Sequence, residues 1–376
     1  MHSSGAGAGG PRLAWPAPSW LALFYDLAFA AAVIAVAGAF GQDHSILGTL
    51  WFATAYGIMF CGWILTGGAT SAFAQADRPV RGPMVILIVV QMAVVLMLGL
   101  VSRESISASS ALFDSLLAVL LATCIGLGVL NRGVVSASRT RTMVLVAAAM
   151  AMLGLAWLLP TLLGLIAWVV ALLVLAGAAT VVLRDAHLSV HRYAHRLGEL
   201  TLIILGEILV KIALTVGSDS AWTLLRVELA PALVLVAVVW WAYFTGPVLI
   251  NELTPKRRVL LTGCHWLLHL ALLGLAVGLG KLVVGSSSLD KWASIAVLLS
   301  GPVVVMIGSL ALMDWVTGNA RASYLGVAAA VAAVVAALAA VVHTGPAVTG
   351  YVLAIVPLIA VALGNRHPKA VTTSVH

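Results

Sequence analysis

A carboxylate and an amine lie four residues apart in a stretch that is otherwise mostly apolar. The stretch runs from residue 200 to 214 and contains Glu207 and Lys211. On a helix this spacing places both side chains on one face, where they can form an ion pair. Ionisable groups inside a membrane span are costly unless they serve each other or a polar cavity. Two interpretations stay open: an ion pair that specifies the fold, and a site that meets water or a substrate.

Two histidines have the same spacing in another apolar stretch. His265 and His269 lie four residues apart, with neither the Glu of a His-Glu-x-x-His motif nor a third ligand placed by the sequence. We therefore predict no metal site. We expect the imidazoles to hydrogen-bond across helices, or to line the same polar interior as Glu207, where they can relay protons.

Asp26 and Arg196 complete the set of candidate residues. Asp26 lies about 9 Å past the start of the first apolar stretch, at 1.5 Å per helical residue. It either accepts hydrogen bonds from a neighbouring helix, or it faces a cavity or pairs with a basic side chain. Arg196 belongs to a basic, His-rich segment at 184–198, which we expect to lie in the cytoplasm beside anionic lipid headgroups.

The elements that position these residues are long apolar stretches. The chain has 376 residues, of which 62% are hydrophobic and 9% charged, whereas soluble domains are about 25% charged. Each stretch is long enough to cross a bilayer, which takes about 20 residues. The pattern predicts an all-α, polytopic integral membrane protein with about twelve transmembrane helices, at about 20–40, 46–69, 83–102, 111–130, 142–159, 161–183, 199–217, 229–250, 259–284, 291–313, 323–343 and 346–364. Pro160 separates the fifth and sixth, with one long broken helix as the alternative.

The positive charges predict the orientation. If the N-terminus is cytoplasmic, fifteen of the twenty Lys and Arg residues fall on the cytoplasmic side and four on the outer side, with Lys211 in the membrane. This asymmetry predicts a cytoplasmic membrane protein with both termini in the cytoplasm. The basic residues form short clusters between apolar stretches, which argues against a nucleic-acid partner despite the net charge of +7.

The two halves of the chain resemble each other. Residues 51–67 contain Trp, Tyr and Gly in an order similar to residues 240–246, and a basic loop with proline follows each. Chance similarity between apolar helices is the alternative to duplication. With six spans per half, duplication predicts two parallel repeats. The expected divisions are a disordered cytoplasmic N-terminus (1–19), a first half (20–183), a basic linker (184–198), a second half (199–364) and a cytoplasmic tail (365–376).

Motifs of soluble enzymes are missing from the sequence. It contains no phosphate-binding glycine loop, no Gly-x-Ser-x-Gly motif and no EF-hand. The three cysteines, Cys61, Cys124 and Cys264, lie in apolar stretches without Cys-x-x-Cys spacing. We therefore predict that the protein is not an enzyme and has no cofactor.

Three motifs resemble those of a known family. The sequence LFYDLAF at residues 23–29 resembles the LFFDLVFV opening of the bacterial low temperature requirement A family, and RLGELTLIILGE at 196–207 is similar to its ERFGLFTIIVLGES segment. His269 and Leu270 match its YLHLPLVAGI segment, in the same order along the chain. The resemblance covers essentially the full length and implies a multi-pass bacterial membrane protein, linked by name to growth in the cold.

The resemblance also identifies candidate residues. Asp26, Arg196, Glu207 and His269 match polar positions of the family motifs. The chain departs from these motifs at four neighbouring positions: His195 replaces Glu, Arg192 replaces His, Ile208 replaces Ser and Ala271 replaces Pro.

Three classes of function follow from these observations. A transporter or channel would move a small solute or ion along a polar path, whose candidate residues are Asp26, Arg196, Glu207, Lys211, His265 and His269. A non-transport membrane protein, such as a lipid-related stress or cold-adaptation factor, would need these charges only for packing. An intramembrane enzyme would need the two histidines to hold a metal. We expect the first class, with membrane lipids as its surroundings.

Overall fold

The long apolar stretches of the chain form helices. The structure is a computed structural model that describes residues 20–43, 45–75, 82–102, 111–130, 136–184, 190–217, 229–245, 254–284, 289–318, 322–342 and 346–365. Within these ranges the backbone forms twelve α-helices and no strand. They are α1 (Trp20–Phe40), α2 (Ile46–Gln75), α3 (Gly82–Val101), α4 (Ala111–Leu130), α5 (Ser136–Ala156), α6 (Thr161–Arg184), α7 (Val190–Gly217), α8 (Leu229–Phe244), α9 (Pro255–Val284), α10 (Leu289–Thr317), α11 (Ala322–Val342) and α12 (Pro346–Asn365).

Eight of these helices are long and apolar enough to cross a membrane over the described residues. They are α1 to α6, α9 and α10. The described apolar parts of α8, α11 and α12 are shorter, and the apolar part of α7 contains Glu199, Glu207 and Lys211. The prediction of an all-helical chain with several possible membrane spans is therefore confirmed for the described residues. Helices suit lipid because their backbone groups are hydrogen-bonded within the segment.

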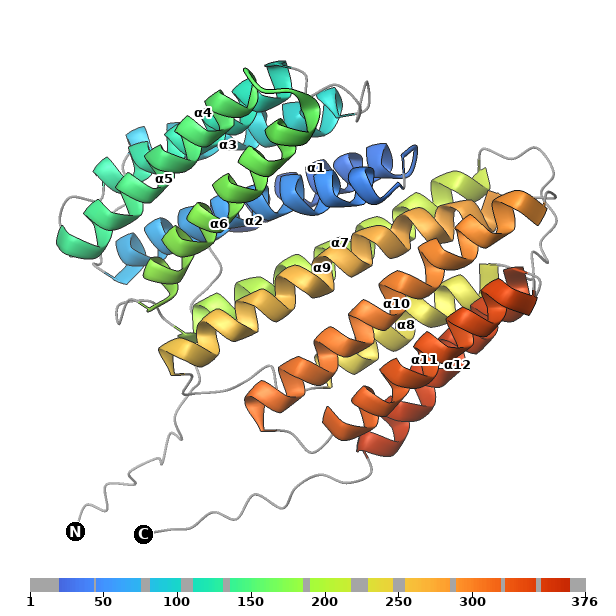
Figure 1. Cartoon of the computed structure of the whole chain (residues 1–376). Coiled ribbons are helices and arrows are strands. Elements are labelled where there is room, and N and C mark those ends of the chain that lie inside the picture. The colour runs from blue at the N-terminus through green and yellow to red at the C-terminus, as the bar shows by residue number, and fades with distance from the viewer. Residues whose placement is uncertain are drawn as a thin grey trace, which may run out of the picture.

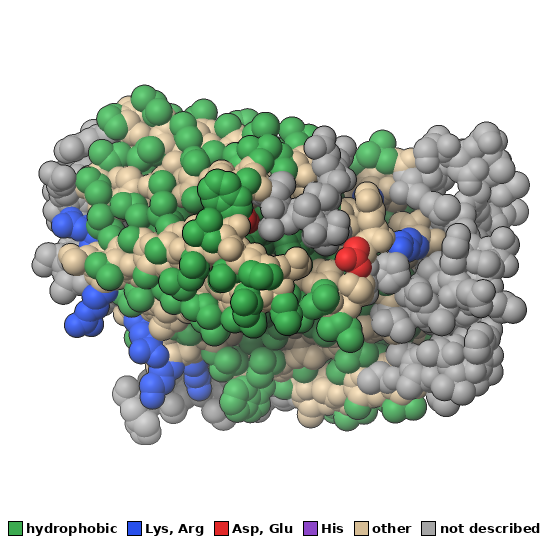
Figure 2. All heavy atoms as spheres, turned by 45° about the horizontal axis from the view of Figure 1, so that its top comes forward, with side chains coloured by type: hydrophobic (Ala, Val, Ile, Leu, Met, Phe, Trp, Pro, Cys, Tyr) green, Lys and Arg blue, Asp and Glu red, His purple; other side chains and the backbone are tan. Residues whose placement is uncertain are grey.

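The surface of the described residues exposes many apolar side chains. Figure 2 shows a broad hydrophobic face, with a group of Lys and Arg side chains towards one end and a further basic side chain beside an acidic one towards the other. Large apolar side chains such as Val144, Trp157 and Leu214 are exposed on this structure, whereas buried polar side chains lie inside it. Lipid solvates the exposed side chains and cannot solvate the polar ones, so this distribution suits a membrane protein.

The helices form two groups that correspond to the two halves of the chain (Figure 1). In the first half, α1 packs against α2 and α3, α2 against α6, and α3 to α6 each against the next. In the second half, α7 packs against α8 and α9, α8 against α12, and α9 to α12 each against the next. These pairings have the same order in both halves, while α2 also contacts α4 and α10 also contacts α12.

The halves meet along a small number of helices. From the first half, α1 packs against α7, and α1, α2 and α6 pack against α9. Figure 1 shows α1 and α2 beside α7 and α9 at the centre of the molecule. Within the described residues, these helices therefore form the main contact between the halves.

The observed helix bounds agree with most of the predicted spans, with two informative results. The fifth and sixth spans are separate helices, which pack against each other and are joined by residues 157–160. The seventh helix begins at Val190, nine residues before the predicted span, so Arg196 lies on a helix and not in a linker. The terminal segments 1–19 and 366–376 lie outside the described residues.

Close approach of two helices leads to a test of the packing. A Cβ atom at Gly278 of α9 would lie 2.6 Å from the backbone oxygen of Leu298 in α10. Because backbone cannot move aside cheaply, we expect Gly278→Ala to lower stability by about 1–3 kcal/mol, the usual cost of overpacking. Thermal unfolding of the purified protein in detergent measures this effect.

The control is the same change at Gly154, where an added Cβ meets nothing within 4 Å. Equal unfolding temperatures for Gly278→Ala and Gly154→Ala would contradict the close approach of α9 and α10.

Candidate functional site

A buried ion pair joins the two halves. Arg196 Nη2 of α7 lies 2.6 Å from Asp26 Oδ1 of α1, and Arg196 Nε donates to Asp26 Oδ2 at 3.4 Å. The Asp26 side chain is fully buried and that of Arg196 is 13% exposed. This two-point contact matches the planar guanidinium to the carboxylate and satisfies both oxygens of Asp26. Asp26 thus pairs with a basic side chain, which is one of the two roles that the sequence left open.

Helix α2 completes the surroundings of the ion pair. The indole N–H of Trp63 donates to Asp26 Oδ1 at 2.6 Å, and Arg196 Cζ lies 4.8 Å from the centroid of the Trp63 ring. The indole therefore donates a hydrogen bond to the acid and places its face beside the cation. Gly67, one turn further along α2, leaves the space for the guanidinium, because a Cβ there would lie 2.5 Å from Arg196 Nη1.

His269 forms a second link between the halves. Its Nε2 lies 2.8 Å from the hydroxyl of Thr201 in α7, and its Nδ1 lies 3.1 Å from the hydroxyl of Tyr56 in α2. Thr201 donates its own proton to the carbonyl of Leu197, so it accepts from His269 Nε2–H. The neutral imidazole then accepts from Tyr56 at Nδ1. The result is a directed chain of hydrogen bonds from Tyr56 through His269 to Thr201.

His265 has a similar arrangement one turn earlier on α9. Its Nδ1 lies 2.8 Å from the carbonyl oxygen of Leu261, which can only accept. The proton is therefore on Nδ1, and Nε2 accepts from the hydroxyl of Tyr243 in α8 at 2.8 Å. The two imidazole centroids are 6.0 Å apart. Both histidines are thus buried and hydrogen-bonded on both ring nitrogens.

These groups form neighbouring hydrogen-bonded clusters that are linked by ring contacts, and we call them together the polar seam. Each member lies at the interface between the halves or contacts a residue at that interface. The members are Asp26, Tyr56, Trp63, Arg196, Thr201, Tyr243, His265 and His269. Asp26 and Arg196 each lie six residues into their helices, or about 9 Å, and His269 lies about 21 Å into α9. The seam therefore runs from one end of the bundle towards its middle.

The structure separates Glu207 and Lys211 from the other candidates. Both side chains are half-buried, and neither forms a hydrogen bond or ion pair with the residues of the polar seam that we describe. Among the described contacts, no ion pair joins Glu207 to Lys211, although their spacing allows one. The Lys211 side chain lies next to α9 at Gly280, where an added Cβ would be 3.9 Å from Lys211 Cε.

Metal binding is not supported within the described ranges. They contain no group of three His, Cys, Asp or Glu side chains that could hold an ion. The nitrogens of His265 and His269 are already engaged in hydrogen bonds. In this structure the two histidines are therefore part of a hydrogen-bonded arrangement.

Aromatic and hydroxyl residues of the seam were not singled out by sequence. Tyr56, Trp63 and Thr201 lie in apolar stretches where such residues are common. The available signal was the repeated Trp and Tyr pattern at 51–67 and 240–246, which contains Tyr56, Trp63 and Tyr243. All three make hydrogen bonds to an acid or imidazole of the seam.

A second buried carboxylate, Asp114 in the first turn of α4, lies outside the seam. The Trp168 indole lies beside it, but neither Asp114 oxygen forms a well-aligned hydrogen bond within the described residues. Trp51, Phe113 and Trp168 pack against one another with ring centroids 5.3–5.9 Å apart. These aromatic surroundings replace little of the hydration that the acid loses on burial, so Asp114 is a source of instability.

The ion pair leads to a stability test. Asp26→Asn removes the only acid that forms a described hydrogen bond with Arg196 and leaves the buried guanidinium with Glu199 as its remaining acidic neighbour, so we expect a loss of about 3–5 kcal/mol. Adding Arg196→Gln removes that charge, so the double variant should regain most of the loss. Thermal unfolding in detergent of the wild type, both single variants and the double variant measures the coupling. Additive losses would show that the two side chains do not interact.

Asp114 is expected to respond in the opposite direction. Asp114→Leu removes a buried carboxylate whose oxygens form no well-aligned hydrogen bond within the described residues. The variant should raise the unfolding temperature, because each unsatisfied buried group costs about 1–3 kcal/mol. Asp26→Leu is the matched comparison and should lower it. A fall in stability for Asp114→Leu would show that the Trp168 indole or another neighbour compensates the carboxylate.

Comparison with known proteins places this arrangement in a family. The family model described as bacterial low temperature requirement A protein (LtrA) matches residues 17–362, a range that includes the whole polar seam. No curated protein and no solved structure matches the chain. Since the match extends over nearly the entire sequence, the chain belongs to the bacterial low temperature requirement A family.

Proposed function

We propose that this membrane protein moves a small solute or ion between two parallel six-helix repeats, along a path that includes the polar seam. The observation that carries the proposal is the placement of hydrogen-bonded imidazoles and an ion pair at the interface between the halves. Buried ionisable groups are expensive in a membrane and commonly mark solute paths or proton relays.

The helix pairings support the repeat. Helices α1 to α6 and helices α7 to α12 pack in a similar order. Helix α1 contacts α2 and α3 as α7 contacts α8 and α9, and α2 contacts α6 as α8 contacts α12. Asp26 and Arg196 each lie six residues into the first helix of their half. Two adjacent helices that run parallel bring residues at the same depth together, whereas antiparallel helices bring opposite ends together. The contact between Asp26 and Arg196 at equal depth therefore supports parallel α1 and α7. In the proposed orientation both termini are cytoplasmic, which agrees with the bias of Lys and Arg.

The seam has the chemistry of a proton relay. Tyr56 donates to His269, and His269 donates to Thr201, so the imidazole lies between a donor and an acceptor. Such an imidazole can take a proton at one nitrogen and release it from the other. The seam is closed in this structure, and a transport cycle needs a second arrangement in which the halves separate around it.

A non-transport role is the second candidate. The observation that favours it is the complete hydrogen bonding of Asp26, His265 and His269 in a buried setting. In a lipid-related or cold-adaptation factor, the seam would serve only to hold the two halves of the protein in register. The two candidates differ in what a conservative substitution does to flux.

Reconstituted vesicles test the proposal. An entrapped pH-sensitive dye reports proton flux under an imposed potassium diffusion potential, and light scattering of the same vesicles reports entry of small solutes. We expect flux above that of protein-free vesicles, and an at least tenfold loss in His269→Phe, because the phenyl ring has no nitrogen to carry the proton. Glu207→Gln tests whether the half-buried acid of α7, which lies apart from the polar seam, belongs to the same path: lowered flux would include it and unchanged flux would confine the path to the seam.

Thr123→Ala is the matched control. Its hydroxyl bonds to the Leu120 carbonyl of its own helix, and α4 does not pack against the second half within the described residues. This variant should keep wild-type flux. Flux equal to that of empty vesicles for well-folded wild type, or full flux in a folded His269→Phe protein, would exclude the proposed path and favour the packing role.

A further inference from the structure

A groove on the lipid-facing side of the first half has the features of a phospholipid site. It lies between α4 and α5, has a volume of about 430 Å³ and is lined by Ile125, Val129, Arg139, Thr140, Met143, Val144 and Ala147. Helix α5 packs against α4 and α6, and it is the least buried of the eight candidate spans. Its remaining surface therefore faces the bilayer, and acyl chains are the molecules that reach the groove.

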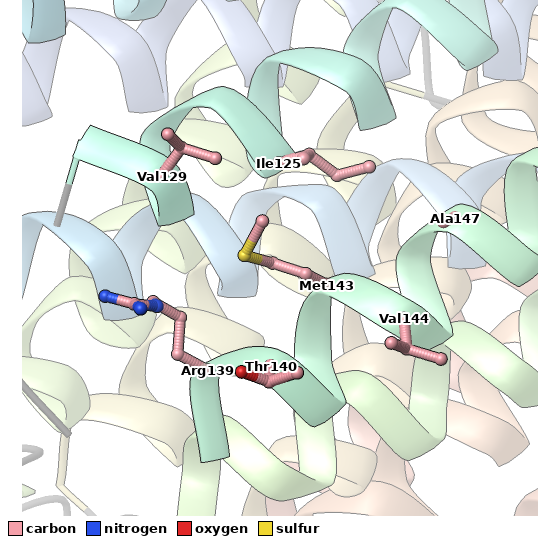
Figure 3. A pocket seen from close by; sticks show the side chains of 7 residues that line it. All are labelled: Ile125, Val129, Arg139, Thr140, Met143, Val144 and Ala147. Atoms are coloured by element: carbon pink, nitrogen blue, oxygen red, sulfur yellow. The ribbon is translucent and has the colours of Figure 1, made fainter. Parts of the chain in front are cut away.

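The groove is apolar along most of its length and basic at one end. Figure 3 shows Arg139 and Val129 at the same end of the groove, with Ile125, Val144 and Ala147 further along. Arg139 lies near the start of α5, where the polypeptide leaves the apolar zone. A phospholipid whose acyl chain lies along the apolar residues would place its phosphate beside the guanidinium of Arg139. The neighbouring Thr140 also lines this end of the groove.

We propose that this groove binds an anionic phospholipid of the leaflet that contacts the first turns of α5. The charge of Arg139 at the end of the groove complements a phosphate at the depth of the headgroups, because arginine binds phosphate oxygens with two parallel hydrogen bonds. The half-burial of Arg139 restricts the guanidinium to this end of the groove. Attraction of basic residues to anionic headgroups extends over about a Debye length, so Arg141 adds only an unspecific contribution from its exposed position.

A second groove provides an internal comparison. It lies between α11 and α12, has a volume of about 530 Å³ and includes Ser323, Tyr324, Val327 and Val331. Its lining within the described residues contains no charged side chain. This groove can hold acyl chains but has no group that distinguishes an anionic from a zwitterionic headgroup.

Native mass spectrometry of the full-length, delipidated protein tests the site. Titration with phosphatidylglycerol and with phosphatidylethanolamine should show preferential retention of phosphatidylglycerol. Arg139→Gln should reduce that preference about tenfold, the effect of losing a charge-assisted contact of about 1.4 kcal/mol. Arg141→Gln is the matched charge control and should keep most of the preference.

Two tryptophan variants test the acyl part of the groove. Val144 and Val327 are 62% and 65% exposed in the two grooves, so Val144→Trp and Val327→Trp make equivalent changes. Val144→Trp should remove the preferentially bound lipid, and Val327→Trp should retain it. Equal binding of the two lipids to the wild type, an unchanged preference in Arg139→Gln, or the same loss in both tryptophan variants would overturn the proposal.

Discussion

The ion pair between Asp26 and Arg196 is the contact on which the arrangement of the two halves depends. It spans 170 residues of sequence and joins the first helix of each half at the same depth. In lipid there is no hydrophobic force that pulls apolar helices together, because acyl chains solvate them equally well. Association of the halves therefore needs directional contacts and close packing. A carboxylate and a guanidinium meet this need because neither can be left alone in hydrocarbon.

The rest of the seam follows from the need to satisfy each polar group. Trp63 contacts both members of the ion pair, and Gly67 leaves room for the guanidinium. His269 is held from both sides by Tyr56 and Thr201, which lie on opposite halves. The net free energy that each of these hydrogen bonds contributes is modest, but removal of one side chain leaves a buried partner without its hydrogen bond. The same residues thus define both the register of the halves and the candidate path.

Sequence reasoning predicted the helices well and their contacts poorly. The bounds of α1 and α4 agree with the predicted spans because hydropathy is an average over many residues. The start of α7 was predicted nine residues late, because Arg196 was counted as a cytoplasmic charge when it is neutralised by Asp26 inside the bundle. Local spacing allowed Glu207 to pair with Lys211 or to face a polar site, and no ion pair between them is among the described contacts. Spacing along a helix shows which side chains can meet, but the facing helices decide which do.

The ion pair also restricts how the halves can move apart. Separation that exposes Asp26 and Arg196 to acyl chains leaves two charges in hydrocarbon, which the bilayer opposes. Separation that admits water is tolerable, since water hydrates both groups. The pair lies about 9 Å from the ends of α1 and α7 at 1.5 Å per residue, so water from that side has the shortest route. Opening would therefore start at the end where the ion pair lies, before it reaches His269 deeper in the bundle.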